Sequence, residues 1–130
     1  MKRKGSCLCG VMKYEVDDVS DRVTHCHCSV CRKFHGAAFA TYGRAINFRW
    51  LEGEHCLHRF ESSPGIARTF CSKCGTSLQF IVEGEDAHVS ISLGTLDETD
   101  GLRPIAHIYT DSKADWFEIT DHLPRHSSSF

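Results

Sequence analysis

The sequence predicts a mainly β domain whose short strands are organised around bound metal. Three observations support this prediction: short segments in which apolar and polar residues alternate, the lack of any long segment with helical periodicity, and eight cysteines gathered into groups. The composition is that of a globular protein, with 41% hydrophobic and 25% charged residues. A length of 130 residues predicts one domain over residues 1–130.

The predicted elements follow the chain in short steps. Residues 11–16 alternate apolar and polar side chains, as a half-buried strand does, and residues 22–27 lead as a second strand into a cysteine cluster. Residues 29–34 are expected to form a turn or helical turn. The later strand candidates are 36–43, 47–51, 56–60, 76–82, 88–93, 105–110 and 116–119. A loop is expected at 97–104, and a frayed tail at 125–130.

Charge and hydropathy argue against two classes of protein. The net charge is -2 and the charges are scattered, whereas a protein that mainly binds nucleic acid is usually clearly basic. No apolar run approaches the ~18 residues of a membrane span. The basic residues 1–4 are followed by no apolar segment, so we expect no secretory signal and predict a cytoplasmic protein. Thiols stay reduced there, which favours metal ligands over disulfides.

The densest cluster of metal-binding residue types lies between residues 24 and 33. Cys26, Cys28 and Cys31 form a Cys-x-Cys-x-x-Cys run, with His25 directly before it and His27 within it. Thiolates suit zinc, which prefers four ligands in a tetrahedron. Three protein ligands with an exchangeable fourth are typical of a catalytic zinc site, whereas a structural site is closed by four. The function therefore depends on whether a fourth protein ligand exists.

The candidate fourth ligands are His25, His27, His35 and Cys56. In a strand the two histidines that alternate with the cysteines would point to the opposite face. Cys56 stands alone in an apolar-alternating stretch and can be a small buried hydrophobe. The sequence thus favours an open zinc position at Cys26, Cys28 and Cys31, filled by water, hydroxide or an incoming thiol.

The remaining cysteines indicate a second, closed site. Cys7 and Cys9 lie between glycines near the start, and Cys71 and Cys74 form a Cys-x-x-Cys-Gly knuckle. Together these four cysteines predict a structural zinc that joins distant parts of the chain. The expected metal content is two Zn²⁺ per chain.

With these motifs the sequence resembles the glutathione-dependent formaldehyde-activating enzyme family, which shares its domain with centromere protein V. The matching segments are 5–10 with 14–16, 26–33 with 36–39, 70–78, 107–109 and 113–116. The resemblance extends over a core of about residues 5–124. It implies a β-tent zinc-binding fold of short antiparallel strands around a four-cysteine zinc site at Cys7, Cys9, Cys71 and Cys74. It also implies that Cys26, Cys28 and Cys31 hold a catalytic zinc.

The same resemblance implies a function and partners. The activity of the family is the addition of glutathione to formaldehyde to give S-hydroxymethylglutathione, a carbon–sulfur lyase reaction. A small thiol and an aldehyde are therefore the expected partners, with no nucleic acid and no membrane. Within this domain family, centromere protein V is similar to a non-enzymatic protein that acts through a basic extension. No such extension is seen in this sequence. Exposed strand edges are compatible with a homodimer.

Residues near the open site suggest how the chemistry would run. Three thiolates on Zn²⁺ carry a net charge of -1, which Arg32 and Lys33 could offset, or these two could hold the carboxylates of glutathione; the alternative is that they are surface charges. His27 is a candidate proton relay. Tyr109 and Trp116 are expected in the core or in the wall of a cleft.

Two other functions remain compatible with the sequence. A non-catalytic zinc-stabilised binding module would close the triplet zinc with a fourth protein ligand, for which Cys56 and His27 are the leading candidates. A redox switch would form disulfides among Cys26, Cys28 and Cys31.

Overall fold

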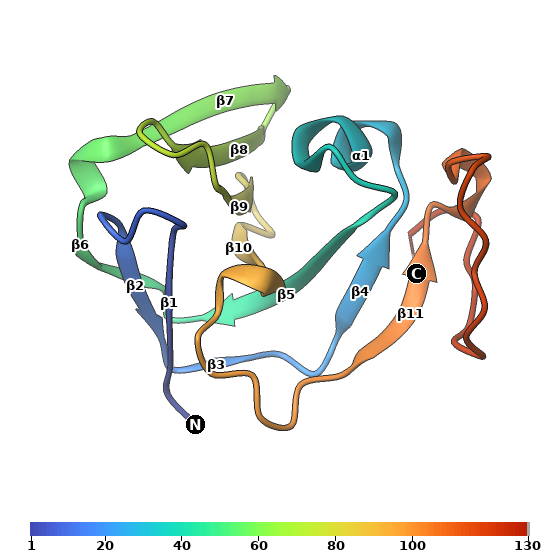
Figure 1. The fold of residues 1–130 in the computed structure, drawn as a ribbon, viewed down its shortest axis with the longest axis horizontal. Helices are drawn as coiled ribbons and strands as arrows, with labels where there is room; N and C mark the ends of the chain where they lie inside the picture. The colour runs from blue at the N-terminus through green and yellow to red at the C-terminus, as the bar shows by residue number, and fades with distance from the viewer. Residues whose placement is uncertain (130) are drawn as a thin grey trace.

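The structure, a computed structural model, describes residues 1–129 and is mainly β, as the sequence predicted. A small sheet has the strand order β1-β2-β6, and a large sheet has the order β11-β4-β5-β10-β9-β8-β7, with β3 paired to β5 (Figure 1). The small sheet contains β1 (Arg3–Ser6), β2 (Lys13–Val16) and β6 (Arg49–Glu52). The large sheet contains β3 (Asp18–Val19), β4 (Val23–Cys26), β5 (Ala40–Ile46), β7 (Leu57–Ser63), β8 (Ile66–Cys71), β9 (Ser77–Val82), β10 (His88–Ser92) and β11 (Pro104–Ile108).

Helical structure is confined to short pieces. The helix α1 (Ser29–His35) follows β4 directly, and Gly36 ends it in a left-handed conformation with φ of 61°. Three 3₁₀ turns are η1 (Glu54–Cys56), η2 (Leu93–Thr95) and η3 (Thr110–Ser112). None of the helices in residues 1–129 is long and apolar enough to cross a membrane.

Strand register decides which side chains share a face of the large sheet. Its pairs are antiparallel except that β11 runs parallel to β4. Thr24 lies opposite Tyr42, Arg44 opposite Ser90, and Phe80 is opposite both Ser90 and Arg68. Because paired residues point to the same side and alternate residues along a strand do too, all of these and Cys26 share one face. His25 lies on the other face, opposite Thr41.

The two sheets are joined by a core centred on β2. Tyr14 and Val16 are buried against Val23 and Ile91 of the large sheet. The Tyr14 hydroxyl forms a hydrogen bond of 2.6 Å with Thr95, and a Cβ added to Gly5 would lie 2.3 Å from the Tyr14 ring. Glycine at position 5 therefore allows the first strand to cross the tyrosine closely.

Several predicted boundaries were wrong. The strand expected at 36–43 begins only at Ala40, because Gly36 is needed to end α1. Residues 116–119 form no strand, since the Lys113 ammonium donates to the carbonyls of Ala114 and Phe117 and holds that segment in a turn. The strands β1, β3 and β8 were not predicted, and the β4–β11 pair is parallel rather than antiparallel.

The C-terminal segment is not a frayed tail over residues 124–128. The His107 N–H donates to the Pro124 carbonyl and the His126 N–H donates back to His107, both at 2.9 Å. The Tyr109 N–H donates to the Ser128 carbonyl at 3.2 Å. These bonds cover the outer edge of β11, beside which the end of the chain lies in Figure 1.

Candidate metal centres and active-site cleft

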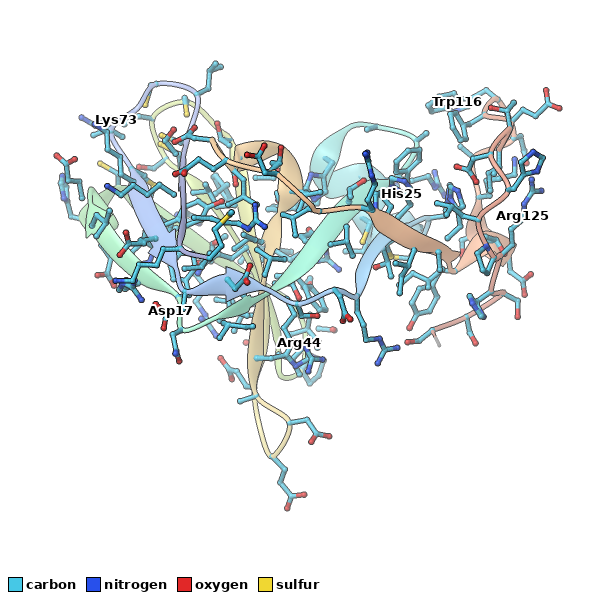
Figure 2. The ribbon with its side chains drawn as sticks, turned by 90° about the horizontal axis from the view of Figure 1, so that it is seen from below. Asp17, His25, Arg44, Lys73, Trp116 and Arg125 are labelled. Atoms are coloured by element: carbon cyan, nitrogen blue, oxygen red, sulfur yellow. The ribbon has the colours of Figure 1, made fainter. Side chains whose placement is uncertain are left out.

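Four sulfurs from distant parts of the chain form the first candidate metal centre. Cys7 and Cys9 come from the loop between β1 and β2, Cys71 is the last residue of β8, and Cys74 lies in the turn that follows. Their Sγ atoms all lie within 4.8 Å of one another. The two loops lie side by side, and Lys73 marks the second of them in Figure 2.

Local backbone bonds shape both loops around the sulfurs. Gly10 and Gly75 each have φ of 79°, a conformation that glycine adopts without strain. The Gly10 N–H donates to the Cys7 carbonyl at 3.0 Å, and the Gly75 N–H donates to the Cys71 carbonyl at 2.8 Å. Each tight turn therefore brings its two cysteines to the same point.

The first group has the geometry and chemistry of a closed zinc site. The Sγ atoms of Cys7 and Cys9 are 3.6 Å apart, close to the ~3.8 Å that a tetrahedral ion with ~2.3 Å bonds would impose. A hydrogen bond from the Thr76 hydroxyl lowers the pKa of Cys74 to about 5, which favours the thiolate that binds metal. Cys56 is buried beside Cys7 and Cys71 but is not part of the group of four.

Three sulfurs form the second candidate metal centre at the end of β4. Cys26 is the last residue of that strand, Cys28 caps α1 by accepting a hydrogen bond from the Cys31 N–H at 3.3 Å, and Cys31 lies in the first turn of the helix. The Sγ atoms of Cys26 and Cys31 are 3.3 Å apart, and all three lie within 4.8 Å. Among residues 1–129, no His, Cys, Asp or Glu completes this group as a fourth ligand.

The charge on these three sulfurs indicates a need for a cation. Hydrogen bonds from Cys26 and Cys31 lower the pKa of Cys28 to about 2. The hydrogen bonds of Cys26 with Cys28 and Cys31, together with burial, raise the pKa of Cys26 far above its usual value. Three thiols this close cannot all ionise to thiolates unless a positive charge lies among them. Three converging soft donors with this property fit a thiophilic divalent ion.

Arg68 supplies a buried positive charge beside the three sulfurs, and sequence reasoning missed it. Its side chain is only 5% exposed. Its Nη1 donates to Cys31 Sγ at 3.6 Å and to the Tyr42 hydroxyl at 3.3 Å. Its guanidinium lies over the Phe80 ring, 4.8 Å from the centroid. No carboxylate of residues 1–129 lies within salt-bridge distance of Arg68, so the sulfurs are the anionic partners at hand.

A cleft of about 760 Å³ opens over the three sulfurs. It lies on the face of the large sheet that carries Cys26, Tyr42 and Arg68, and its apolar lining includes Phe80 and Ile108. Tyr109 lines it as well, whereas Trp116 is 74% exposed and lies outside the lining. Figure 2 shows Trp116 far from Lys73, on the C-terminal segment.

His27 is placed away from this cleft. It is fully buried, and its Nε2 is 2.8 Å from Nδ1 of His107, whose Nε2 donates to Asp121 at 2.9 Å. Burial lowers the pKa of His27 to about 4, so the ring is neutral at pH 7. His25 bonds instead to the Thr41 hydroxyl at 2.7 Å. Neither histidine lines the cleft.

The other predicted residues near the triplet are also outside the cleft lining. Lys33 is exposed on α1, and Arg32 is half-buried on the same helix. His35 contacts the site indirectly, because its Nε2 is 2.7 Å from the Tyr42 hydroxyl. The cation next to the sulfurs is therefore Arg68 rather than Arg32 or Lys33. Only the pairing of β8 with β9 brings it there, and no local motif marks it.

Comparisons with known proteins agree with this site. A profile of the glutathione-dependent formaldehyde-activating enzyme family matches residues 2–112. A Halomonas elongata protein proposed by name to be such an enzyme is 29% identical over 136 residues, covering 92% of this chain and 82% of that protein. An uncharacterized lyase of Schizosaccharomyces pombe is 23% identical over 118 residues, covering 91% of this chain and 85% of that protein.

A solved structure shares the fold. The crystal structure of a Rhodobacter sphaeroides protein superimposes with a TM-score of 0.60 at 25% identity, covering 78% of this chain and 91% of that chain. The resemblance seen in the sequence is thus confirmed: the chain belongs to the glutathione-dependent formaldehyde-activating enzyme family.

Proposed function

We propose that the chain is a zinc-dependent carbon–sulfur lyase that joins a thiol such as glutathione to an aldehyde such as formaldehyde. The single observation that carries this proposal is a group of three sulfurs with no fourth ligand among residues 1–129, at the floor of a cleft and beside a buried guanidinium. Family membership and the lyase name of a relative support the reaction class.

Cys26, Cys28 and Cys31 would hold the catalytic zinc, and Cys7, Cys9, Cys71 and Cys74 the structural zinc. The ion held by the three sulfurs would supply a positive centre that favours the thiolate form of a thiol substrate. The reaction then needs no oxidant or reductant. A sulfur–carbon bond forms, the carbonyl π bond opens, and the aldehyde oxygen gains the proton that the thiol has lost.

The residues of the cleft floor would stabilise the charge on this path. Three cysteine thiolates holding a divalent ion would carry a net charge of -1, and a substrate thiolate would add a further negative charge. Arg68, in contact with Cys31 Sγ, would offset one unit of this charge. The negative charge that develops on the aldehyde oxygen would fall within the same field. Arg68 is fixed for this role by the Phe80 ring and by the Tyr42 hydroxyl, which His35 holds from the other side.

The positions of two residues weaken the binding-module alternative. That function needs a fourth protein ligand on the triplet zinc, for which Cys56 and His27 are the leading candidates. Cys56 is buried in the cluster around the other cysteine group, and the His27 ring is paired with His107. We therefore keep the enzyme as the proposed function and expect it in a reducing, cytoplasmic setting.

Calorimetric titration of the zinc-loaded protein with glutathione and with S-methylglutathione tests the proposal. We expect glutathione to bind with release of a proton, and S-methylglutathione to bind without proton release and more weakly. Because glutathione adds to formaldehyde unaided, the exchange rate between formaldehyde and S-hydroxymethylglutathione must also be measured by NMR with and without protein. Cys28→Ser is the control. If the exchange rate with wild-type protein equals the rate without protein, the enzyme assignment is overturned.

A further inference from the structure

The lining of the cleft is positively charged although the chain as a whole is not. The protein has 17 acidic residues against 15 lysines and arginines. Yet among residues 1–129 the titratable side chains of the lining, other than the three cysteines and two tyrosines, are Arg22, Arg44, Arg68 and His88. No Asp or Glu of the described chain lines the cleft. Such a lining attracts an anion and repels a cation.

The positive side chains lie at two places in the cleft lining, one beside the sulfurs and one farther along the strands. Arg68 lies beside the sulfurs, whereas Arg44 lies two residues beyond Tyr42 on β5 and on the same face. One such step along a strand is ~7 Å. Figure 2 shows Arg44 below the sheet near the foot of the hairpin between β9 and β10, with His25 on the opposite side. Arg22 precedes β4 by one residue, ~13 Å along the strand from Cys26.

Arg44 is held in place by a histidine and not by an acidic side chain. Its Nη2 is 3.4 Å from Nε2 of His88, and Nδ1 of His88 is 2.7 Å from the Asp86 carbonyl. A carbonyl only accepts, so Nδ1 of His88 donates to Asp86 and Nε2 is free to accept from Arg44. Arg44 is therefore oriented by an imidazole nitrogen rather than by a carboxylate.

Three arginines outside the cleft lining are paired with carboxylates. Arg3 pairs with Asp18, Arg49 with Glu15 and Asp17, and Arg59 with Glu83. No carboxylate of residues 1–129 lies within salt-bridge distance of Arg44. The guanidinium farther along the cleft is thus available to an anion that arrives with the ligand.

Building on the function proposed above, we infer that this part of the cleft is an anion subsite, in which Arg44 selects thiols that carry a carboxylate. The ligand would place its sulfur at Cys26, Cys28 and Cys31 and its carboxylate on the order of 10 Å away, at the guanidinium of Arg44. Hydroxyls of Ser62, Ser63 and Ser90 line the cleft as well and offer further donors. Glutathione, with a carboxylate at each end, satisfies this requirement, and small neutral thiols do not.

Thiol binding by the zinc-loaded protein tests this subsite with two ligands. Glutathione carries both carboxylates, and its diethyl ester has the same thiol with both blocked. We expect the Kd of wild type to be about five- to tenfold higher for the ester, as for the loss of an exposed charge-assisted contact. Arg44→Gln should raise the Kd for glutathione by the same factor, change kcat less than twofold, and leave the ester unaffected. Arg44→Lys should keep part of the preference for glutathione over its ester that Arg44→Gln loses.

Arg103→Gln is the matched control, because Arg103 is an exposed arginine outside the cleft lining and its replacement should leave the binding of both ligands as in wild type. Equal affinity of wild type for glutathione and its ester would overturn the subsite and leave the proposed function standing. If Arg44→Gln raised the Kd for glutathione and for the ester by the same factor, the subsite would also be overturned, because Arg44 would then have a structural role. If wild type binds neither thiol, the proposed function itself fails.

Discussion

At the scale of single residues, Arg68 connects burial to chemistry. A guanidinium that is 5% exposed is costly to bury unless an anion compensates it, and the nearest anionic group is the cysteine triplet. The sequence could not reveal this, because Arg68 sits in an ordinary run between Ala67 and Thr69. The cysteines were found because ligand spacing is local, whereas the arginine reaches them only through the register of β8 against β9.

Replacing Arg68 by methionine should separate this charge from the packing. Methionine keeps an apolar contact with Phe80 but removes the positive charge next to Cys31. Hydrogen bonds to charged groups contribute about 1.5–3 kcal/mol, so kcat/KM should fall by roughly 10- to 100-fold. The melting temperature should change little, because the variant also removes the cost of burying a cation.

Arg68→Lys is the matched comparison for that experiment. Lysine keeps the charge but loses the planar stacking of the guanidinium on Phe80, so an intermediate kcat/KM is expected. A methionine variant with wild-type kcat/KM would show that the guanidinium has no part in the reaction.

At the scale of elements, the alternating pattern identified most strands but missed β1, β3 and β8. The strand β8 contains Arg68 and Thr69, which are 5% and 0% exposed, and hydropathy alone does not distinguish such residues from a loop. The parallel β4–β11 pair and the segment that covers it depend on contacts across the whole chain. No local signal at 124–128 predicts them, since those residues form bonds only when β11 is present.

The C-terminal segment should therefore be necessary for a stable sheet edge. Truncation after Leu123 removes the four backbone bonds of His107, Tyr109 and Thr110 to the segment, which at roughly 0.5–1.5 kcal/mol each amount to about 2–6 kcal/mol. Of these four bonds, truncation after His126 removes the one from Tyr109 to Ser128 and should cost about 0.5–1.5 kcal/mol. Urea unfolding measures both values.

Light scattering adds a second observation on the same pair of truncations. An uncovered β11 edge presents unpaired N–H and C=O groups, so the shorter chain should associate at a concentration at which the longer one stays monodisperse. Equal unfolding midpoints for the two truncations would show that the segment does not stabilise the sheet.

At the scale of the whole molecule, the two cysteine groups differ in how much of the chain they join. Cys26, Cys28 and Cys31 lie within one local turn. The other four cysteines connect the small sheet, through the β1–β2 loop, to the end of β8 in the large sheet. Their proposed roles as structural and catalytic centres follow from this topology. The sequence could suggest the division because the spacing within each motif is local, but the closeness of Cys7 to Cys71 needed the fold.

This difference predicts opposite outcomes for two single substitutions. A structural zinc contributes on the order of 10–16 kcal/mol, comparable to the roughly 5–15 kcal/mol stability of a whole domain. Cys71→Ser should therefore leave the chain unfolded, as circular dichroism and thermal melting will show. Cys28→Ser should fold with one zinc fewer per chain and lose thiol-dependent activity, because no distant segment depends on it. A soluble Cys71→Ser protein with an unchanged melting curve, or a Cys28→Ser protein that does not fold, would contradict the assignment of the two centres.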